Sequence, residues 1–351
     1  MRLPISIRRI VQGIALVAAL LPTLAACDSV LDNDYGDCEV TYHVRFKYDY
    51  NMEFVDAFAP QVKSVSLYAF AADGTLTHSV AAPVSQLATQ GNTMQVDFDP
   101  SQYRLVAWGD LDVQGATFSV PLMQPGNGLL DDMQCTMQRS RQADGQATVT
   151  ELTALYHAAL DRPALVVEND DELNPVVEMP LMKNTNTLRV ILQNLSQEPI
   201  GPDDFHFCIT DENGLMNHDN TLLTDETLTY LPFYKGQGSV DYNRSSRASS
   251  DNSTQLNVAI AEFCFGRIMD GGEARLTITN QATGKPVLSI PLAQYLALVK
   301  SHYNRQMSNQ EYFDRQDEYS LTFFLDEQGN WLAASILVNG WRVVLSDVEI
   351  D

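Results

Sequence analysis

The chain has 351 residues, 45% of them hydrophobic, and carries 22 basic against 45 acidic side chains, a formal charge of −23. This hydrophobic content is typical of a folded globular protein and too high for a disordered one. A surface this negative repels nucleic acid and anionic lipid, which argues against a nucleic-acid-binding role. The length is long for one hydrophobic core and predicts two domains.

Residues 1–26 have the layout of a secretion signal. Three arginines precede an apolar run over residues 10–21, which is too short to span a bilayer comfortably, and small residues then lead into a cysteine. The segment Leu-Ala-Ala-Cys at 24–27 resembles the bacterial lipobox, which implies cleavage before Cys27 and a lipid on its sulfur. The alternative is an ordinary signal peptide that happens to end near a cysteine.

Residues 27–37 are predicted to form an acidic tether between the lipid and the fold. Removal of the signal with its three arginines leaves 19 basic and 45 acidic side chains, a charge of −26. Each buried methylene of an acyl chain contributes about 0.8 kcal/mol, so two or more chains hold a protein firmly. The acidic stretch also resembles the signal that sends Bacteroidota lipoproteins to the outer cell surface, although a solvated linker explains it equally well. We expect a lipid-anchored protein of the cell outer membrane, exposed at the surface.

The rest of the sequence predicts short β-strands separated by turns. Residues 40–49 alternate apolar with polar side chains, so that one face of the strand is buried and the other is wet. Further strands are predicted at 62–70, 95–98 and 103–108. This succession of short strands and turns is typical of an all-β protein built as an antiparallel sandwich.

A new strand at 187–192 follows the polar residues 183–186, and we place a domain boundary there. The prediction is one β-sandwich domain at 38–182 and a second at 183–351. Short helices are predicted after Pro291, where apolar residues recur at helical spacing, and at 309–315. The strand-forming segment 336–345 is expected to pair within the second domain or to be donated to a neighbouring subunit, because an exposed apolar edge is costly.

Four cysteines remain once Cys27 carries a lipid. An even number of cysteines in an exported protein favours disulfides. Of the three pairings possible, only Cys38 with Cys135 and Cys208 with Cys264 keeps each bridge within one proposed domain. The alternative is free thiols buried as small hydrophobes. The spacings are wide and include no C-x-x-C, so zinc is not expected.

The sequence contains no recognisable catalytic constellation. It lacks a G-x-S-x-G elbow and an H-E-x-x-H helix, and its six histidines have no metal-like spacing. The acidic run Glu168–Glu172 offers oxygen ligands for calcium, but its spacing matches no known loop, and a solvated acidic loop is the favoured interpretation. We therefore expect no enzyme activity, no cofactor and no metal.

Several segments together resemble the FimB-like anchor-subunit family of Bacteroidales fimbriae, the type V pili of the fimbrillin superfamily. They are Cys38 with Tyr48–Met52, Tyr103–Gly109, Leu188–Val190, Gln310–Arg315 and Val338–Trp341. The resemblance implies two transthyretin-like β-sandwich domains with short helical insertions on an outer-membrane lipoprotein. It also implies a structural role: fixing the base of a fimbrium to the cell and limiting its length. The expected partners are fimbrial shaft or accessory subunits, joined by β-strand complementation, in which main-chain hydrogen bonds supply much of the affinity.

Two other functions compete with the anchor hypothesis. A surface lipoprotein that binds glycan or a host protein is the main alternative, and exposed Trp and Tyr side chains in a shallow groove would favour it. An esterase or protease with an unrecognised site is the less favoured one, because no nucleophile and base are paired in the sequence.

Overall fold

The computed structural model describes residues 40–344, apart from 169–170, 196–198, 243–253 and 304. The predicted signal, Cys27, the tether and Cys38 therefore lie outside the described residues. The fold is all-β with short helical insertions, arranged as two transthyretin-like β-sandwiches, which confirms the predicted fold class. Within the described part of the chain, no helix combines the length and the apolar character needed to cross a membrane.

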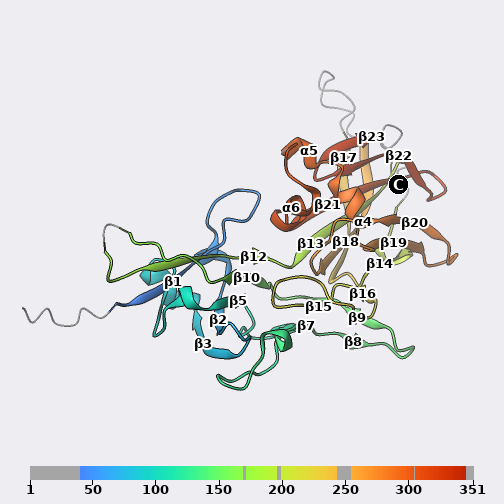
Figure 1. Cartoon of the computed structure of the whole chain (residues 1–351). Helices are drawn as coiled ribbons and strands as arrows, with labels where there is room; N and C mark the ends of the chain where they lie inside the picture. The colour runs from blue at the N-terminus through green and yellow to red at the C-terminus, as the bar shows by residue number, and fades with distance from the viewer. Residues whose placement is uncertain (1–39, 169–170, 196–198, 243–253, 304, 345–351) are drawn as a thin grey trace, which may run out of the picture.

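The first sandwich, on the left of Figure 1, consists of a three-stranded and a five-stranded sheet. The smaller sheet has the order β11 (Val176–Pro180), β1 (Tyr42–Lys47) and β4 (Thr93–Val96). The larger has the order β12 (Met182–Lys183), β10 (Tyr156–Asp161), β5 (Arg104–Gly109), β2 (Ser64–Phe70) and β3 (Leu76–Pro83). Short helices α2 (Phe58–Gln61) and α3 (Val84–Leu87) lie between strands.

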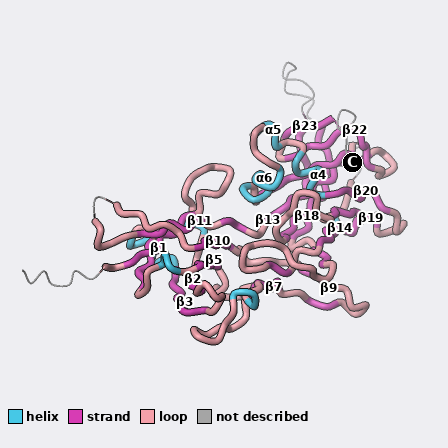
Figure 2. Tube along the Cα trace, in the orientation of Figure 1, coloured by secondary structure: helices cyan, strands magenta, loops and turns pink. Residues whose placement is uncertain are grey.

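The second sandwich consists of two six-stranded sheets, which we name the β13 sheet and the β14 sheet. The β13 sheet has the order β17 (Tyr234–Tyr242), β18 (Thr254–Phe265), β13 (Asn186–Asn194), β21 (Glu318–Leu325), β22 (Trp331–Val338) and β23 (Trp341–Val344). The β14 sheet has the order β20 (Pro286–Pro291), β19 (Arg275–Asn280), β14 (Phe205–Asp211), β16 (Leu228–Tyr230), β9 (Ala147–Val149) and β8 (Ser140–Arg141). Figure 2 shows how loops and short helices connect these strands.

Helices and a small sheet complete the second half. The helices are α4 (Leu292–Ala297), α5 (Lys300–Tyr303) and α6 (Asn309–Arg315), two of which fall where the sequence predicts helical turns. Strands β6 (Phe118–Ser119), β7 (Cys135–Met137) and β15 (Leu215–Met216) form a three-stranded sheet. The predicted carboxyl-terminal strand is present as β22 and β23, which pair with each other in the β13 sheet.

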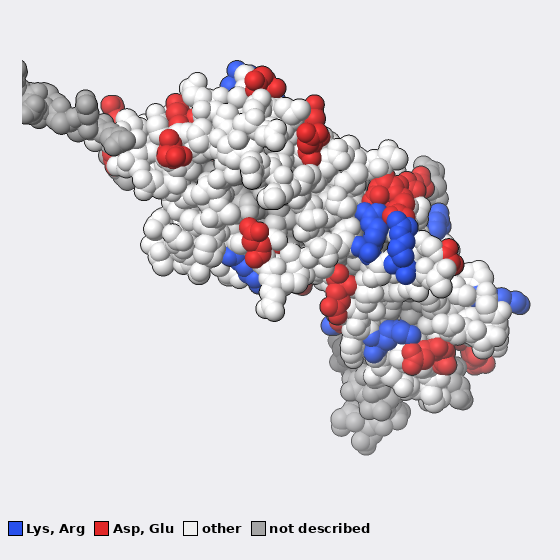
Figure 3. Space-filling model, turned by 90° about the horizontal axis from the view of Figure 1, so that it is seen from below, with Lys and Arg blue, Asp and Glu red and all other residues white. Residues whose placement is uncertain are grey.

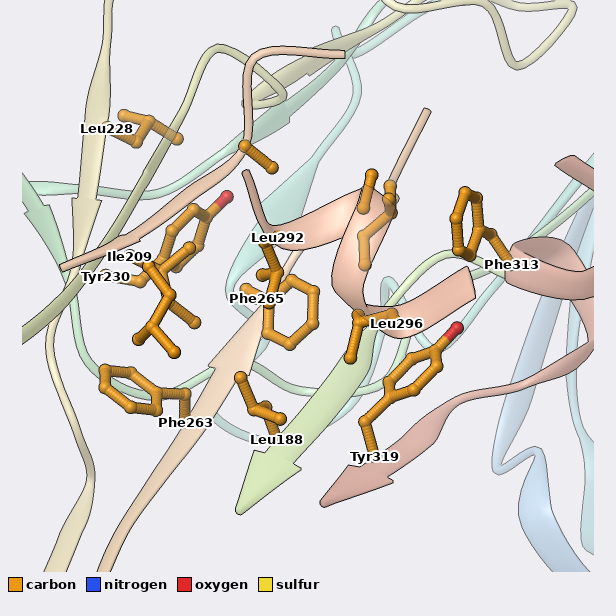
Figure 4. Packing of buried hydrophobic residues seen from close by; sticks show 14 of the residues in the cluster. Leu188, Ile209, Leu228, Tyr230, Phe263, Phe265, Leu292, Leu296, Phe313 and Tyr319 are labelled. Carbon is orange, nitrogen blue, oxygen red and sulfur yellow. The ribbon is translucent and has the colours of Figure 1, made fainter. Parts of the chain in front are cut away.

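The core of the second sandwich follows from period-two alternation. In β13, Leu188, Val190 and Leu192 are buried, whereas Arg189 between them is exposed. The same alternation in β14 turns Phe207 and Ile209 inward. Figure 4 shows the side chains of the two sheets meeting face to face, with the helices covering one end. Burying such residues stabilises the fold by about 1.5–3 kcal/mol each.

The sheets are mixed rather than antiparallel throughout, which differs from the sequence-based expectation. Strand β1 pairs in parallel with β11, β13 with β21, and β9 with β16. Parallel partners need a long crossover between them. Because the partners in each pair are far apart in the chain, periodicity within one strand carries no information about them.

The two halves of the chain also interlock. Strands β8 and β9 precede residue 182 in the sequence, yet they extend the β14 sheet of the second sandwich through the pairing of β9 with β16. Strand β7 likewise pairs with β15 from the second half. A cut between residues 182 and 183 therefore falls within β12 and does not separate the sheets.

The predicted bridge between Cys208 and Cys264 is wrong. Both residues are free thiols. Cys208 lies between the buried Phe207 and Ile209 of β14, and Cys264 lies between two buried phenylalanines of β18, so each thiol is on the outward side of its own sheet. Two sheets packed through their inner faces hold these sulfurs apart, and a disulfide requires Cα atoms within about 7 Å.

Cys135 is likewise a free thiol, fully buried in the core beside Met133 and Met137. Its burial raises the pKa of the thiol to about 12, so the side chain stays protonated and unreactive at neutral pH. The proposed partner, Cys38, lies outside the described residues.

Alkylation without reduction tests whether Cys208 and Cys264 are free thiols. We expect the peptides that contain Cys208 and Cys264 to carry separate alkyl groups when the chain is unfolded in iodoacetamide, because neither sulfur has a partner. The midpoint of thermal unfolding should be the same with and without reductant. A linked Cys208–Cys264 peptide in a mass spectrum of the unreduced digest would contradict the assignment.

Candidate functional site at the junction of the two sandwiches

Polar and aromatic side chains connect the two sandwiches in the described chain. The loop after β1 contacts α6 of the second sandwich through Arg315. Its guanidinium carbon lies 4.0 Å from the ring centroid of Tyr50 and 4.8 Å from that of Phe54. A cation over two aromatic faces is stabilised electrostatically, by about 0.5–1 kcal/mol at an exposed site and more when desolvated.

Arg315 is held in place from its own helix. Its Nε donates a hydrogen bond to Glu311 Oε1 at 3.0 Å, one helical turn earlier. The helix itself begins at the N-cap Ser308, whose hydroxyl accepts from the backbone N–H of Glu311. Such a cap satisfies an otherwise unpaired N–H and fixes where the helix starts. The guanidinium is thus positioned before the aromatic loop packs on it.

An ion pair joins the halves beside this contact. Lys183 Nζ of β12 lies 2.5 Å from Asp317 Oδ2, and both side chains are mostly buried. The backbone N–H of Thr187 donates to the carbonyl of Asp317, so the same residue also aligns β13 with β21. Removing one partner of a partly buried pair leaves an uncompensated charge, which costs more than a surface pair contributes.

A buried hydrogen-bond network around Asn220 also belongs to the junction. The amides of Asn184 and Asn220 exchange two hydrogen bonds, of 2.7 and 3.0 Å, and both residues are buried. The carbonyl of Asn220 accepts from Arg267, which also donates two hydrogen bonds of 2.9 Å to the carboxylate of Asp314 in α6. Charge-assisted bidentate pairs of this kind combine strength with fixed orientation.

His157 completes the junction from the first sandwich. Its ring packs on Trp108 with centroids 4.4 Å apart, and Nε2 donates to the carbonyl oxygen of His218 at 2.8 Å. Burial lowers the pKa of His157 to about 4, so the imidazole is neutral at physiological pH. A neutral ring carries its proton on one nitrogen only, so this contact requires the tautomer with the proton on Nε2.

Four of the segments that carried the family resemblance meet here. Tyr50, Trp108, Asp314 and Arg315 come from three of them and make the contacts described above. Asn339, from the fourth, accepts from the backbone N–H of Ser320 and contacts the hydroxyl of Tyr312 at 3.4 Å. The segments are therefore far apart in sequence but joined in space.

Sequence reasoning missed several junction residues. His157, Asn184, Asn220 and Arg267 have no local pattern that marks them, because their partners lie 36 to 61 residues away in the chain. The positive φ of Asn220, 69°, reflects the Asp-Asn turn in which it sits, a pattern that predicts a turn but not a buried amide pair.

The structure also places the other residues that the sequence singled out. Glu168 of the acidic run binds Arg45 through two hydrogen bonds of 2.6 and 2.8 Å, and Asp171 accepts from the backbone of Leu173. The described residues contain no group of three or more His, Cys, Asp or Glu side chains arranged to hold a metal ion.

Some of the charged side chains on the surface form ion pairs. Figure 3 shows acidic side chains scattered over one face, with basic side chains beside several of them. One network joins Arg139 to Asp225 at 2.8 Å and to Glu226 at 3.1 Å, with Arg141 at 2.6 Å from the same Glu226. Burial alone would raise the pKa of Asp225, but the hydrogen bonds from Arg139 and from the backbone N–H of Glu226 outweigh it and lower the pKa.

These observations define a class of all-β protein, in which two β-sandwiches are joined through interlocked sheets and a polar junction. A family model described as fimbrillin-A associated anchor proteins Mfa1 and Mfa2 matches residues 35–347. The chain belongs to this family of fimbrial anchor proteins, which is a family of structural proteins and not of enzymes.

Individual relatives agree with this assignment. The minor fimbrium anchoring subunit Mfa2 of Porphyromonas gingivalis is 21% identical over 98% of both chains. A solved structure of a candidate adhesin from Bacteroides thetaiotaomicron has a TM-score of 0.76 at 30% identity, covering 89% of this chain and 99% of that one. The solved fimbrial anchor Mfa2 from P. gingivalis shares the fold, with a TM-score of 0.57 at 17% identity over 87% and 98%.

Replacement of Arg315 by Ala tests the junction. We expect the free energy of unfolding to fall by about 1–2 kcal/mol, because the variant loses both ring contacts and the bond to Glu311. Urea denaturation measures this, and limited proteolysis of the loop at 49–56 should become faster. Arg104→Ala is the matched control: Arg104 pairs with Asp161 at 3.4 Å on the exposed surface and should cost about 0–1 kcal/mol. Equal losses in the two variants would contradict a special role for Arg315.

Replacement of His157 by Leu tests the buried histidine and its pH dependence. The His218 carbonyl loses its donor, which costs about 1–3 kcal/mol at neutral pH. The folded pKa of about 4 lies below the unfolded value of 6.5, so the histidine contributes stability that is complete above 6.5 and is lost as pH falls toward 4. Urea titrations at neutral and acid pH should show a smaller acid loss in the variant than in the native protein. An identical loss in both would refute the assignment.

Proposed function

We propose that this protein anchors the base of a fimbrium to the bacterial outer membrane and limits the length of the fimbrium. The family membership over residues 35–347 is the observation that carries the proposal, because it makes the chain a fimbrial anchor protein. The lipobox-like segment ending at Cys27 supplies the means of attachment. Two or more acyl chains on this residue would hold the protein on the membrane without a spanning helix.

The acidic surface supports attachment through lipid rather than through charge. A mature chain with 19 basic and 45 acidic side chains is repelled by anionic headgroups, so electrostatic binding offers no substitute for the acyl chains. The localisation that follows is the outer membrane, with the two sandwiches exposed on the cell surface.

Strand complementation is the mode by which we propose that the anchor holds a fimbrial subunit. Among the described strands, β23 and β17 form the two edges of the β13 sheet and are the candidates to receive an added strand. An added strand gains main-chain hydrogen bonds along its length and side-chain pockets at alternate positions. The partners are shaft or accessory subunits of the same fimbrium.

Replacement of Cys27 by Ala tests attachment and function together. Both sandwiches should fold, because they begin near residue 40, beyond the tether. We expect the protein to leave the outer-membrane fraction for the periplasm or medium, and fimbriae to be shed and to grow longer. Fractionation with immunoblotting follows the protein, and electron microscopy follows the fimbriae. Cys264→Ala, which removes a free thiol distant from the lipid, is the matched control and should change neither.

The outcomes separate two parts of the proposal. A Cys27→Ala protein that stays in the outer membrane would show that the cysteine is not the anchor point. A protein that is released while fimbriae remain attached at normal length would leave the lipoprotein assignment intact but contradict the anchoring role.

A further inference from the structure

A groove crosses the outward face of the β13 sheet, on the side away from the core. It has a volume of about 500 Å³. Thr187 and Arg189 of β13 line its floor, with Glu262 of β18 and Glu318 and Ser320 of β21 beside them. Strands in a sheet lie about 4.8 Å apart, so a floor of three strands is about 10 Å wide.

Two aromatic side chains form the rims of this groove. Phe233 is 39% exposed and Tyr303 is 43% exposed, and both line the same depression. The backbone N–H of Phe233 donates to the carbonyl of Glu262 at 2.9 Å, and the ring of Tyr303 packs on the buried Tyr312 with centroids 5.8 Å apart. Both rims are thus supported by the fold.

The floor between the rims is polar and carries a small excess of negative charge. Arg189 Nε lies 2.7 Å from Glu262 Oε1, and the Arg189 side chain is 59% exposed. The hydroxyls of Thr187 and Ser320 and the carboxylate of Glu318 add further donors and acceptors. Two carboxylates against one guanidinium disfavour an anionic ligand.

We propose that this groove binds a neutral oligosaccharide. A sugar ring has an apolar face of C–H bonds, which suits an aromatic side chain, and a rim of hydroxyls, which suits a floor with both donors and acceptors. Few, fixed polar groups set between aromatic walls are typical of small-ligand sites. The ligand is uncharged because the floor carries more acid than base. This activity is separate from attachment of a fimbrium and does not depend on it.

Saturation-transfer NMR with the full chain in detergent tests the proposal. The probes are maltotriose, cellotriose and chitotriose as neutral trisaccharides, and sialyllactose as an acidic one. We expect saturable binding of at least one neutral probe below about 10 mM. Phe233→Ala and Tyr303→Ala should each weaken it by up to about tenfold, the effect of one lost aromatic contact.

Three further variants make the test specific. Thr187→Trp fills the exposed floor without removing either rim and should abolish binding. Tyr234→Ala and Trp341→Ala remove aromatic side chains that are 50% and 47% exposed but do not line the groove, and both should bind as the native protein does. Circular dichroism confirms that each variant is folded.

Three results would overturn the proposal. They are binding of none of the neutral probes, binding that survives Thr187→Trp, and binding lost equally in the Tyr234 or Trp341 controls. Tighter binding of sialyllactose than of every neutral probe would refute the assignment of an uncharged ligand.

Discussion

The parallel pairing of β9 with β16 is the constraint on which the architecture depends. Ala147, Thr148 and Val149 pair with three residues of β16, so that a strand from the first half of the chain lies inside a sheet of the second. One continuous hydrophobic cluster consequently includes Trp108 and Phe118 together with residues of β13 and β21. The second sandwich cannot complete its β14 sheet without β8 and β9 from the first half of the chain, and the polar groups of the junction hold the two halves together.

The positions of many strands and helices could be predicted because each one has a local spacing of apolar residues. The alternation in β1 and the helical spacing of Leu292, Tyr295 and Leu296 are local, and the structure confirms both. Strand order, parallel pairing and the crossing of β8 and β9 could not be predicted, since they depend on partners distant in the sequence. The same reason explains why no local pattern marks Asn184 and Arg267. Tyr50 and Arg315 lie in segments that resemble the family, but the sequence does not show that they contact each other.

The residues on either side of Cys208 and Cys264 indicate which way each thiol points. Cys208 lies between Phe207 and Ile209, and Cys264 lies between two phenylalanines. In a strand with one buried face, apolar neighbours on both sides place the middle residue outward. This alternation assigns both thiols to the outer faces of their sheets, which rules out a bridge between them even though both lie in the second half of the chain. The same alternation puts Arg189 and Glu262 on the outer face, where the floor of the groove lies.

The position of β1 has a mechanical consequence. In the sequence, β1 follows the predicted tether, and it is the central strand of its sheet, with β11 parallel on one side and β4 antiparallel on the other. Strands β1 and β23 lie at opposite ends of the molecule (Figure 1). Under the proposed function, a pull between the lipid at residue 27 and a partner at the far end would load β1 along its own axis, so its hydrogen bonds would resist together in shear instead of opening one after another. Force spectroscopy with handles at the two ends would measure this resistance.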